Sequence, residues 1–265
     1  MVIIGRNGVG KSALLEFVEC RNMKKRLWPF LEFEHTKISL RRPIWDYAKV
    51  RFLIGDLLRN NTAQVKKWQV RTKLIRSPYL NVGCGPYAHP DFINIDYAWH
   101  PEVEICYDVL KSIPLPDASL RGIFTEHCLE HITFDQCQAV LRDFYRLLQP
   151  GGTVRIIVPD AELYIDLYHK AHQGESVDFP YVDQHQWAMG YTPLMSLNRI
   201  FRDHGHLYAY DAQTMALQLE HAGFTNVQKT TFRVGHDPHL LIDQETRAPE
   251  SLYMEASKPH LCASS

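Results

Sequence analysis

The sequence lacks any apolar stretch near the roughly 18 residues that a membrane-spanning helix needs. Its 6 cysteines include no C-x-x-C pair, so it signals neither a disulfide framework nor a zinc site built on cysteine. It also lacks internal repeats, low-complexity segments and the charged start and apolar core of a secretory leader. We therefore expect a globular, cytoplasmic protein with no transmembrane segment and no metal site.

The 265 residues, 45% of them hydrophobic, are enough to bury a full core. The net charge of -1 hides an asymmetry, because residues 1–76 hold 17 Lys/Arg and 6 Asp/Glu, whereas the remainder holds 12 and 24. Either the two parts attract each other, or the basic part faces an anionic partner such as nucleic acid, or it is a solvated face without a partner. We divide the chain into a short basic N-terminal extension (1–76) and an acidic domain (77–260). No pattern indicates an oligomeric state.

From residue 79 onward, short apolar runs alternate with helical patterns, which is typical of a parallel sheet covered by helices. Helical spacing of apolar residues predicts helices at 135–148, before Pro150-Gly151-Gly152, and at 211–222, before Gly223. The predicted strands are 79–82, 92–95, 103–106, 122–125, 153–158, 227–234 and 252–256. We expect the last two to form a closing antiparallel pair.

Residues 161–210 are far longer than the connection that links neighbouring elements of such a sheet. Segments of that length are usually functional or disordered, and this one is rich in Tyr, Trp and His, which argues against disorder. We interpret it as a cap over a substrate pocket.

A glycine-bracketed turn, Gly83-Cys84-Gly85, follows the first predicted strand, and the second strand ends in Asp96. Glycines let a ligand approach the backbone, and an acidic residue at the end of the next strand suits the hydroxyls of a ribose. Only residues 86–92 separate the turn from the second strand, which is too few for a crossover helix. A pyrophosphate cofactor such as NAD normally rests on that helix, whereas S-adenosylmethionine (SAM) has no phosphate and loses less without it.

With the segments TEHCLEH (125–131) and LQPGG (148–152), the sequence resembles the SAM-dependent class I methyltransferases over about residues 78–258. It is most similar to members with Leu-Asn-hydrophobic-Gly-Cys-Gly and Glu-His-x-Leu-Glu-His segments. The resemblance implies an α/β fold, a Rossmann-like sheet that is mostly parallel with an antiparallel last strand and has helices on both faces. It also implies SAM as the cofactor.

The resemblance also assigns residue roles. The glycine turn meets the methionine part of SAM, Asp96 binds the ribose, Asp108 lies by the adenine and 125–131 lies beside the sulfonium. The cofactor-binding residues that it implies are Asn81, Gly83, Cys84, Gly85, Asp96, Asp108, Val109 and Thr125. Two positions depart from the family pattern, because Asn81 stands where many members carry an acid and Tyr87 where the fuller turn has a third glycine.

Methyl transfer from SAM mainly requires that nucleophile, methyl and sulfur be aligned. A hydroxyl acceptor also benefits from a general base, usually His near neutral pH. His127 and His131, just past the fourth strand, are therefore candidate catalytic residues together with Glu126; each His is alternatively a structural residue bonded to a backbone carbonyl. The resemblance points to a small-molecule acceptor, including sugars of surface polysaccharide pathways, and the basic extension makes nucleic acid the competing acceptor.

Three rival interpretations remain. His127 to His131 also matches H-x-x-E-H, a zinc-peptidase signature that requires a sizeable helix, for which little room is left here. Residues 5–12 (GRNGVGKS) match the phosphate-binding P-loop and resemble the loop of ABC and SMC-type ATPases, but 21–76 show no apolar strand ending in a magnesium-binding Asp. The third interpretation is a methyltransferase-like module that binds SAM without catalysis.

Overall fold

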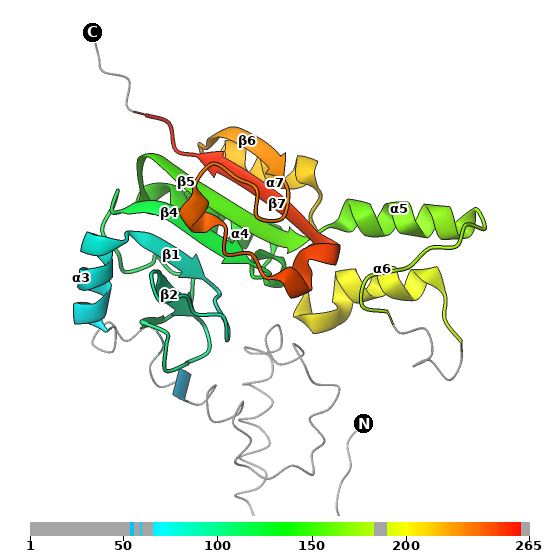
Figure 1. Cartoon of the computed structure of the whole chain (residues 1–265), viewed down its shortest axis with the longest axis horizontal. Helices are drawn as coiled ribbons and strands as arrows, with labels where there is room; N and C mark the ends of the chain where they lie inside the picture. The colour runs from blue at the N-terminus through cyan, green and yellow to red at the C-terminus, as the bar shows by residue number, and fades with distance from the viewer. Residues whose placement is uncertain (1–53, 56–58, 60–65, 183–189, 261–265) are drawn as a thin grey trace, which may run out of the picture.

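The computed structural model describes residues 54–55, 59, 66–182 and 190–260. A seven-stranded sheet runs through it in the order β3-β2-β1-β4-β5-β7-β6 (Figure 1). The strands are β1 (Tyr79–Val82), β2 (Ile93–Asp96), β3 (Ile105–Cys106), β4 (Leu120–Glu126), β5 (Leu148–Pro159), β6 (Thr225–Thr230) and β7 (Ser251–Ser257). β7 is antiparallel to both of its neighbours, β5 and β6, while β1 to β5 pair in parallel. The predicted Rossmann-like class I methyltransferase sheet, with its closing antiparallel pair, is confirmed.

Helices flank this sheet. The α-helices among the described residues are α3 (Lys67–Arg76), α4 (Phe134–Leu147), α5 (Ala161–His172), α6 (Pro193–Arg202) and α7 (Ala212–His221). The short 3-10 helices are η1 (Leu129–His131), η3 (Asp203–Gly205), η4 (Pro238–Leu240) and η5 (Glu245–Glu250). Among the described residues, none of these helices is long and apolar enough to cross a lipid bilayer.

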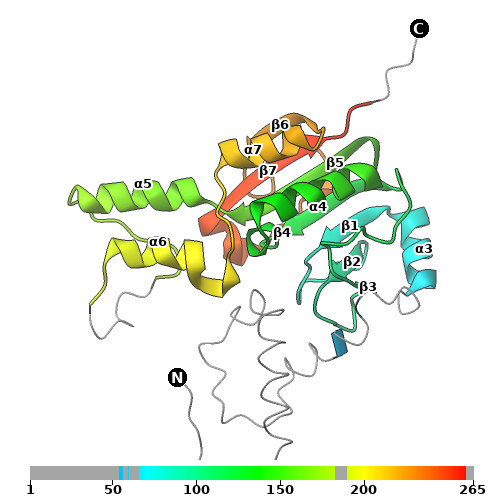
Figure 2. The same ribbon diagram turned by 180° about the vertical axis from the view of Figure 1, so that it is seen from behind.

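The two faces of the sheet are covered differently. α4 and α7 pack side by side on one face (Figure 2), where the apolar side of α4 (Val140, Leu141, Phe144, Leu147) enters the larger core. α4 starts at a capping box in which Thr133 and Gln136 exchange hydrogen bonds, which explains its sharp beginning. The other face carries a smaller core in which Leu240 of η4 packs against aromatic residues of the strands.

The connection between β1 and β2 contains no helix, as its length predicted. The next connection is also irregular, and β3 is two residues shorter than expected. The N–H of Val103 bonds the carbonyl of His100 in a turn, and the strand begins only after this turn, at Ile105.

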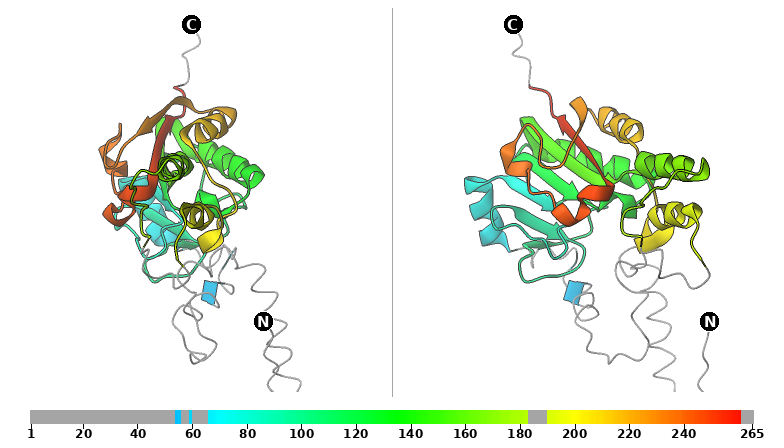
Figure 3. Two further views of the ribbon diagram at one scale, coloured as in Figure 1. Left: turned by 90° about the vertical axis from the view of Figure 1, so that its right-hand side faces the viewer. Right: turned by 45° about the vertical axis from the view of Figure 1, so that its right-hand side comes forward.

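The predicted cap leaves the sheet and returns to it at one place. Asp160, at the end of β5, forms a parallel bridge with Tyr210, and the carbonyl of Tyr210 accepts the N–H of Ala161. Between these points, α5 and α6 lie side by side beyond the end of the sheet (Figure 3) and share a small core around Tyr164 and Ile200. The segment is thus mainly helical where it is described, and its role as a substrate cap stays a prediction.

α3 packs on the β2 side of the sheet although it belongs to the sequence range assigned to the basic extension. Val70 of α3 is buried in the larger core, and the Nζ atom of Lys73 lies 2.9 Å from Oε1 of Glu104. The last ten residues of the predicted extension thus form a helix that packs on the sheet. The P-loop-like segment at 5–12 and the rest of 1–53 lie outside the described residues.

A buried ion cluster joins β5 and β7 to the segment 231–243, which contains η4. The Arg155 side chain, fully buried in β5, donates two hydrogen bonds to Asp243 and one to Glu255. Its remaining bonds go to the carbonyls of Thr231 and Val234. Both carboxylates are almost fully buried too, so the guanidinium neutralises charges that would otherwise be very costly inside the protein.

Candidate active site

The sequence-predicted cofactor residues meet at the carboxyl ends of three neighbouring strands. β1 lies between β2 and β4, with Val82 paired to Ile95 on one side and Thr125 on the other. The glycine turn therefore emerges beside both Asp96 and the segment 126–131. This is the point at which the strand order reverses, where open α/β sheets bind their ligands.

The two turn glycines have different tasks. Both have positive φ angles, 67° at Gly83 and 50° at Gly85, which side chains other than glycine rarely adopt. A Cβ atom at Gly83 would lie only 2.5 Å from Sγ of Cys128, so this glycine lets β1 pack against the segment after β4. A Cβ at Gly85 would meet no atom within 4 Å. Gly85 therefore borders open space, which is where a ligand can approach the backbone.

This difference gives a matched pair of variants. We expect Gly83→Ala to lower the free energy of unfolding by about 1–2 kcal/mol more than Gly85→Ala, because only the first adds a collision to the backbone strain that both share. Gly85→Ala should instead weaken cofactor binding while the protein stays folded. Denaturant unfolding and calorimetric titration with SAM measure the two effects. Equal stability of the two variants would contradict the assignment of the Cys128 contact.

Asp96 stands at the end of β2 with its carboxylate inside the turn. Oδ2 accepts the N–H of Gly85 at 2.7 Å, and Oδ1 accepts the N–H of Ala98 at 2.6 Å. The residue is only 8% exposed. An ionised carboxylate only accepts hydrogen bonds, and it has about four acceptor positions. A carboxylate held in this way beside an open glycine turn fits the paired hydroxyls of the SAM ribose.

The side chains of Asn81 and Cys84 make contacts inside the protein next to the glycine turn. The Asn81 side-chain amide donates to the carbonyl of Tyr87 and to Oδ1 of Asn94, which ties the start of the turn to the following loop. The Cys84 side chain is buried, and burial raises the pKa of its thiol well above the ordinary value, so the thiol stays neutral. The structure thus gives these two side chains contacts within the protein, and the Cys84 backbone bonds Ile95 and Tyr87.

The predicted adenine residues lie one strand further out. Oδ1 of Asp108 accepts the N–H of Leu110 at 3.1 Å in a turn after β3, and Val109 beside it is half-buried. The N–H of Tyr107 bonds the backbone carbonyl of Asp96 at 2.9 Å, so this turn is attached to the ribose position. The predicted ribose and adenine residues are therefore neighbours along the edge of the sheet.

Beyond β4 the chain turns sharply at His127, whose φ is 49°. Its N–H bonds the carbonyl of Ile157 in β5, and its Nε2 lies 2.8 Å from Oγ of Ser251 in β7. Burial lowers the pKa of this imidazole well below its ordinary value, so it is neutral. His131 is also buried, which lowers its pKa to about 3, and its ring lies 5.0 Å from that of His206. Both candidate catalytic histidines are therefore enclosed and neutral.

Glu126 is the third candidate catalytic residue and ends β4. Its Oε1 accepts the N–H of Gln244 at 3.0 Å, and burial raises the pKa of its carboxyl to about 7. A carboxyl that titrates near neutral pH is suited to taking a proton from an acceptor. The oxygen of Thr125, next to it, is fully buried.

The H-x-x-E-H segment is not a helix. Among its residues only Leu129–His131 form a single 3-10 turn, and His127 has left-handed backbone angles. The two histidines of the motif therefore do not share one helical face, which the zinc-peptidase interpretation requires.

Sequence reasoning missed several residues that surround this site. Gln244, Arg247 and Ser251 come from η5 and the start of β7, more than 100 positions after the segment that they border. The positive charge of Arg247 favours the ionised form of Glu126, although burial outweighs it in the pKa of that carboxyl. The Arg247 guanidinium also lies 5.9 Å from the ring centre of Tyr87, in the loop after the glycine turn. No local motif marks these positions.

Comparisons with known proteins show which family the chain matches. A family model described as a methyltransferase domain matches residues 70–229. A probable S-adenosylmethionine-dependent methyltransferase of Mycolicibacterium smegmatis is 32% identical over 98 residues, covering 31% of this chain and 37% of that protein. The chain thus matches little more than a third of the length of this curated relative.

Two solved structures illustrate the similarity in shape. A SAM-dependent methyltransferase of Archaeoglobus fulgidus is 16% identical with a TM-score of 0.42, covering 78% of this chain and 99% of that one. Phosphoethanolamine N-methyltransferase 2 of Haemonchus contortus, in complex with S-adenosyl-L-methionine, is 13% identical with a TM-score of 0.41, covering 83% and 59%.

Proposed function

Because the chain belongs to the methyltransferase-domain family, we propose that it transfers a methyl group from SAM to a small-molecule acceptor. SAM is the cofactor of this family, as the name of the Mycolicibacterium relative also states. The observation that carries the proposal is the Asp96 carboxylate, held by the N–H of Gly85 next to a turn that borders open space. A ribose needs that acceptor, and the close approach of a ligand needs that glycine.

When bound, SAM supplies a methyl group already activated by its cationic sulfur. The protein then mainly has to position the acceptor and exclude water, which accounts for several kcal/mol of a barrier of this kind. We propose that Gly83, Cys84 and Gly85 hold the methionine part with their backbone, and that Asp108 and Val109 border the adenine. The segment from Thr125 onward would then face the sulfonium, because Cys128 packs against Gly83.

For a hydroxyl acceptor, we propose Glu126 as the general base, since its pKa of about 7 suits proton transfer near neutral pH. His127 and His131 would position it and shape the site. We expect Glu126→Gln to lower kcat by about 100-fold with little change in KM, because only the proton transfer is lost. Glu162→Gln, on an exposed side chain of α5, is the matched control and should act as wild type. An unchanged kcat in the Glu126 variant would show that Glu126 is not the general base.

The charge of the chain after residue 76 supports a small-molecule acceptor over a nucleic acid. Outside the first 76 residues the chain holds 24 Asp/Glu against 12 Lys/Arg, so a polyanion would be repelled from the region where the chemistry occurs. The helices α5 and α6, which share an aromatic core, extend from the sheet near this site and suit a cap over a small ligand. Sugars of surface polysaccharide pathways fall within this class of acceptor.

The test has two steps. Calorimetry should show binding of SAM and S-adenosylhomocysteine in preference to NAD and ATP. A methyl-transfer screen with labelled SAM then compares sugar nucleotides, small hydroxylated compounds, RNA and DNA, with the full chain and with one that lacks residues 1–53. We expect transfer to a small molecule that does not depend on salt. Salt-sensitive methylation of RNA or DNA that requires the N-terminal residues would refute the small-molecule proposal.

A further inference from the structure

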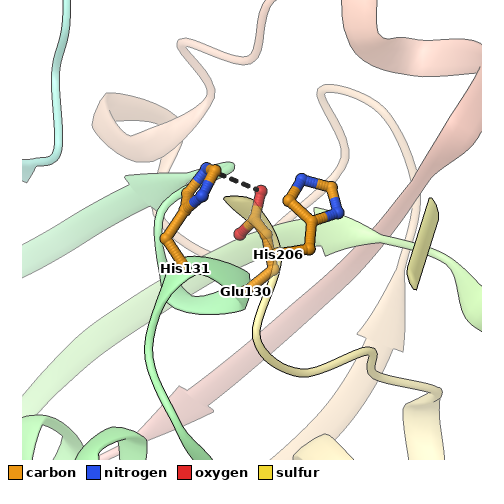
Figure 4. Close-up of side chains that lie close together, drawn as sticks. All are labelled: Glu130, His131 and His206. Atoms are coloured by element: carbon orange, nitrogen blue, oxygen red, sulfur yellow. Dashed lines mark ion pairs between the residues drawn. The ribbon is translucent and has the colours of Figure 1, made fainter. Parts of the chain in front are cut away.

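Three buried side chains with metal-binding atoms converge behind the end of β4. Glu130 and His131 belong to η1, and His206 follows η3, where the cap returns to the sheet (Figure 4). One ligand atom of each lies within 4.8 Å of the other two. All three residues are buried, so no ordinary solvated surface cluster explains the arrangement.

The Glu130 carboxylate is the most informative member. The residue is 1% exposed, and within the described part of the chain neither of its oxygens has a hydrogen-bond partner. The nearest nitrogens are Nδ1 of His127 at 3.6 Å and Nε2 of His131 at 3.8 Å from Oε1, too far for hydrogen bonds. A buried carboxylate without partners is costly, and a cation at this place would remove the cost.

The hydrogen bond of His206 leaves one of its ring nitrogens free to bind a metal ion. Nδ1 of His206 lies 2.7 Å from the carbonyl of Ile200, which can only accept, so Nδ1 carries the proton and Nε2 has a free lone pair. Metal-binding histidines usually donate their other N–H to a carbonyl in this way.

The same reasoning applies to His127, next to the cluster. The hydroxyl of Ser251 donates to the carbonyl of Arg247, so its oxygen accepts the Nε2–H of His127. Nδ1 of His127 therefore presents a lone pair to Glu130. The nitrogen and the carboxylate are both acceptors, and a cation bound between them would satisfy both.

The backbone already holds the two halves of the cluster together. The N–H groups of Leu207 and Tyr208 both bond the backbone carbonyl of Glu130, at 2.8 and 3.2 Å. These bonds fix His206 relative to Glu130 and His131 before any ion binds, which lowers the ordering cost of binding.

We propose that Glu130, His131 and His206 bind one divalent transition-metal ion. Zinc is the ion that fits this ligand set best. Two imidazoles and one carboxylate are a common protein ligand set for zinc, with bonds of about 2.0–2.2 Å that place ligand atoms roughly 3.3 Å apart. Binding an ion therefore requires the three side chains to draw together, from 3.8 Å between Glu130 and His131 and from up to 4.8 Å within the cluster. The ion joins the returning end of the cap to the segment beside the sulfonium position, and its role is to position that segment. The proposed site uses the Glu and the second His of the H-x-x-E-H pattern, but His206 takes the place of His127 as the third ligand. The pattern alone therefore does not reveal the site.

The proposal is tested on untagged full-length protein, since a histidine tag would itself bind metal. After loading with zinc and removal of excess, elemental analysis should find one zinc per chain in wild type. Competition with a chromophoric chelator should show at least about 100-fold weaker binding in Glu130→Gln and His206→Asn. His221→Asn, on an exposed face of α7, is the matched control and should bind as wild type.

A second readout separates lost binding from lost folding. Added Co²⁺ should give the visible d–d bands of a nitrogen and oxygen site in wild type and in the control, but not in the two site variants. Circular dichroism of the metal-free forms should be the same for all four proteins. Absence of stoichiometric zinc in wild type, or unchanged affinity in both folded site variants, would overturn the proposal.

Discussion

Replacing Arg155 by alanine is expected to lower the free energy of unfolding by about 3–5 kcal/mol, since it leaves two buried carboxylates without their counter-charge. Asp243 and Glu255 are 0% and 1% exposed, so water cannot replace the guanidinium. The same carboxylates accept the N–H groups of Arg233 and His236, so we also expect faster hydrogen exchange at these two amides. Denaturant unfolding and amide exchange measure the two effects.

Arg142→Ala is the control for this variant, because Arg142 lies on an exposed position of α4. Its free energy of unfolding should change by no more than about 0.5 kcal/mol. If Arg155→Ala were equally well tolerated, the cluster would not hold the segment 231–243 to the sheet.

Asp96→Ala should weaken SAM binding by about 3 kcal/mol, roughly 150-fold. Two losses add up here. The ribose hydroxyls lose a charged acceptor, and the N–H of Gly85 loses the bond that holds the glycine turn in its conformation. Calorimetry with SAM and S-adenosylhomocysteine should show the same loss for both, because they share the ribose.

Asp91→Ala removes an exposed carboxylate from the same loop and should bind SAM as wild type does. Asp96→Asn keeps the shape of the side chain but not its charge. Its affinity for SAM should lie between those of Asp96→Ala and Asp91→Ala. Unchanged affinity in Asp96→Ala would place the cofactor away from the end of β2.

The strand and helix pattern was largely readable from local sequence. The helix predicted at 135–148 is α4 at 134–147, and the first strand agrees in both limits. These elements are coded by the spacing of their own apolar residues, and their ends by a capping box or glycines nearby. β5 was predicted too short, because Pro150 and the glycines after it were read as a turn although they continue the strand. β4 pairs with Leu148 and then only from Thr153 onward, so Pro150 to Gly152 form an irregularity within the strand, where the two glycines bond the backbone of Lys258.

The cofactor edge was also readable, because its parts lie within short motifs: Gly83-Cys84-Gly85 after one strand and Asp96 after the next. Strand order in a fold of this kind then brings them together. The sequence alone thus determined the sheet, and it predicted the cofactor edge and three candidate catalytic residues. Only the tertiary structure placed Ser251 beside His127 and the His206 ring 5.0 Å from that of His131. Only it showed that, within the described part of the chain, neither oxygen of the buried Glu130 carboxylate has a hydrogen-bond partner. The physical reason is that contacts between positions 75 or more apart depend on how separate elements pack, and periodicity and turn signals describe only neighbours along the chain.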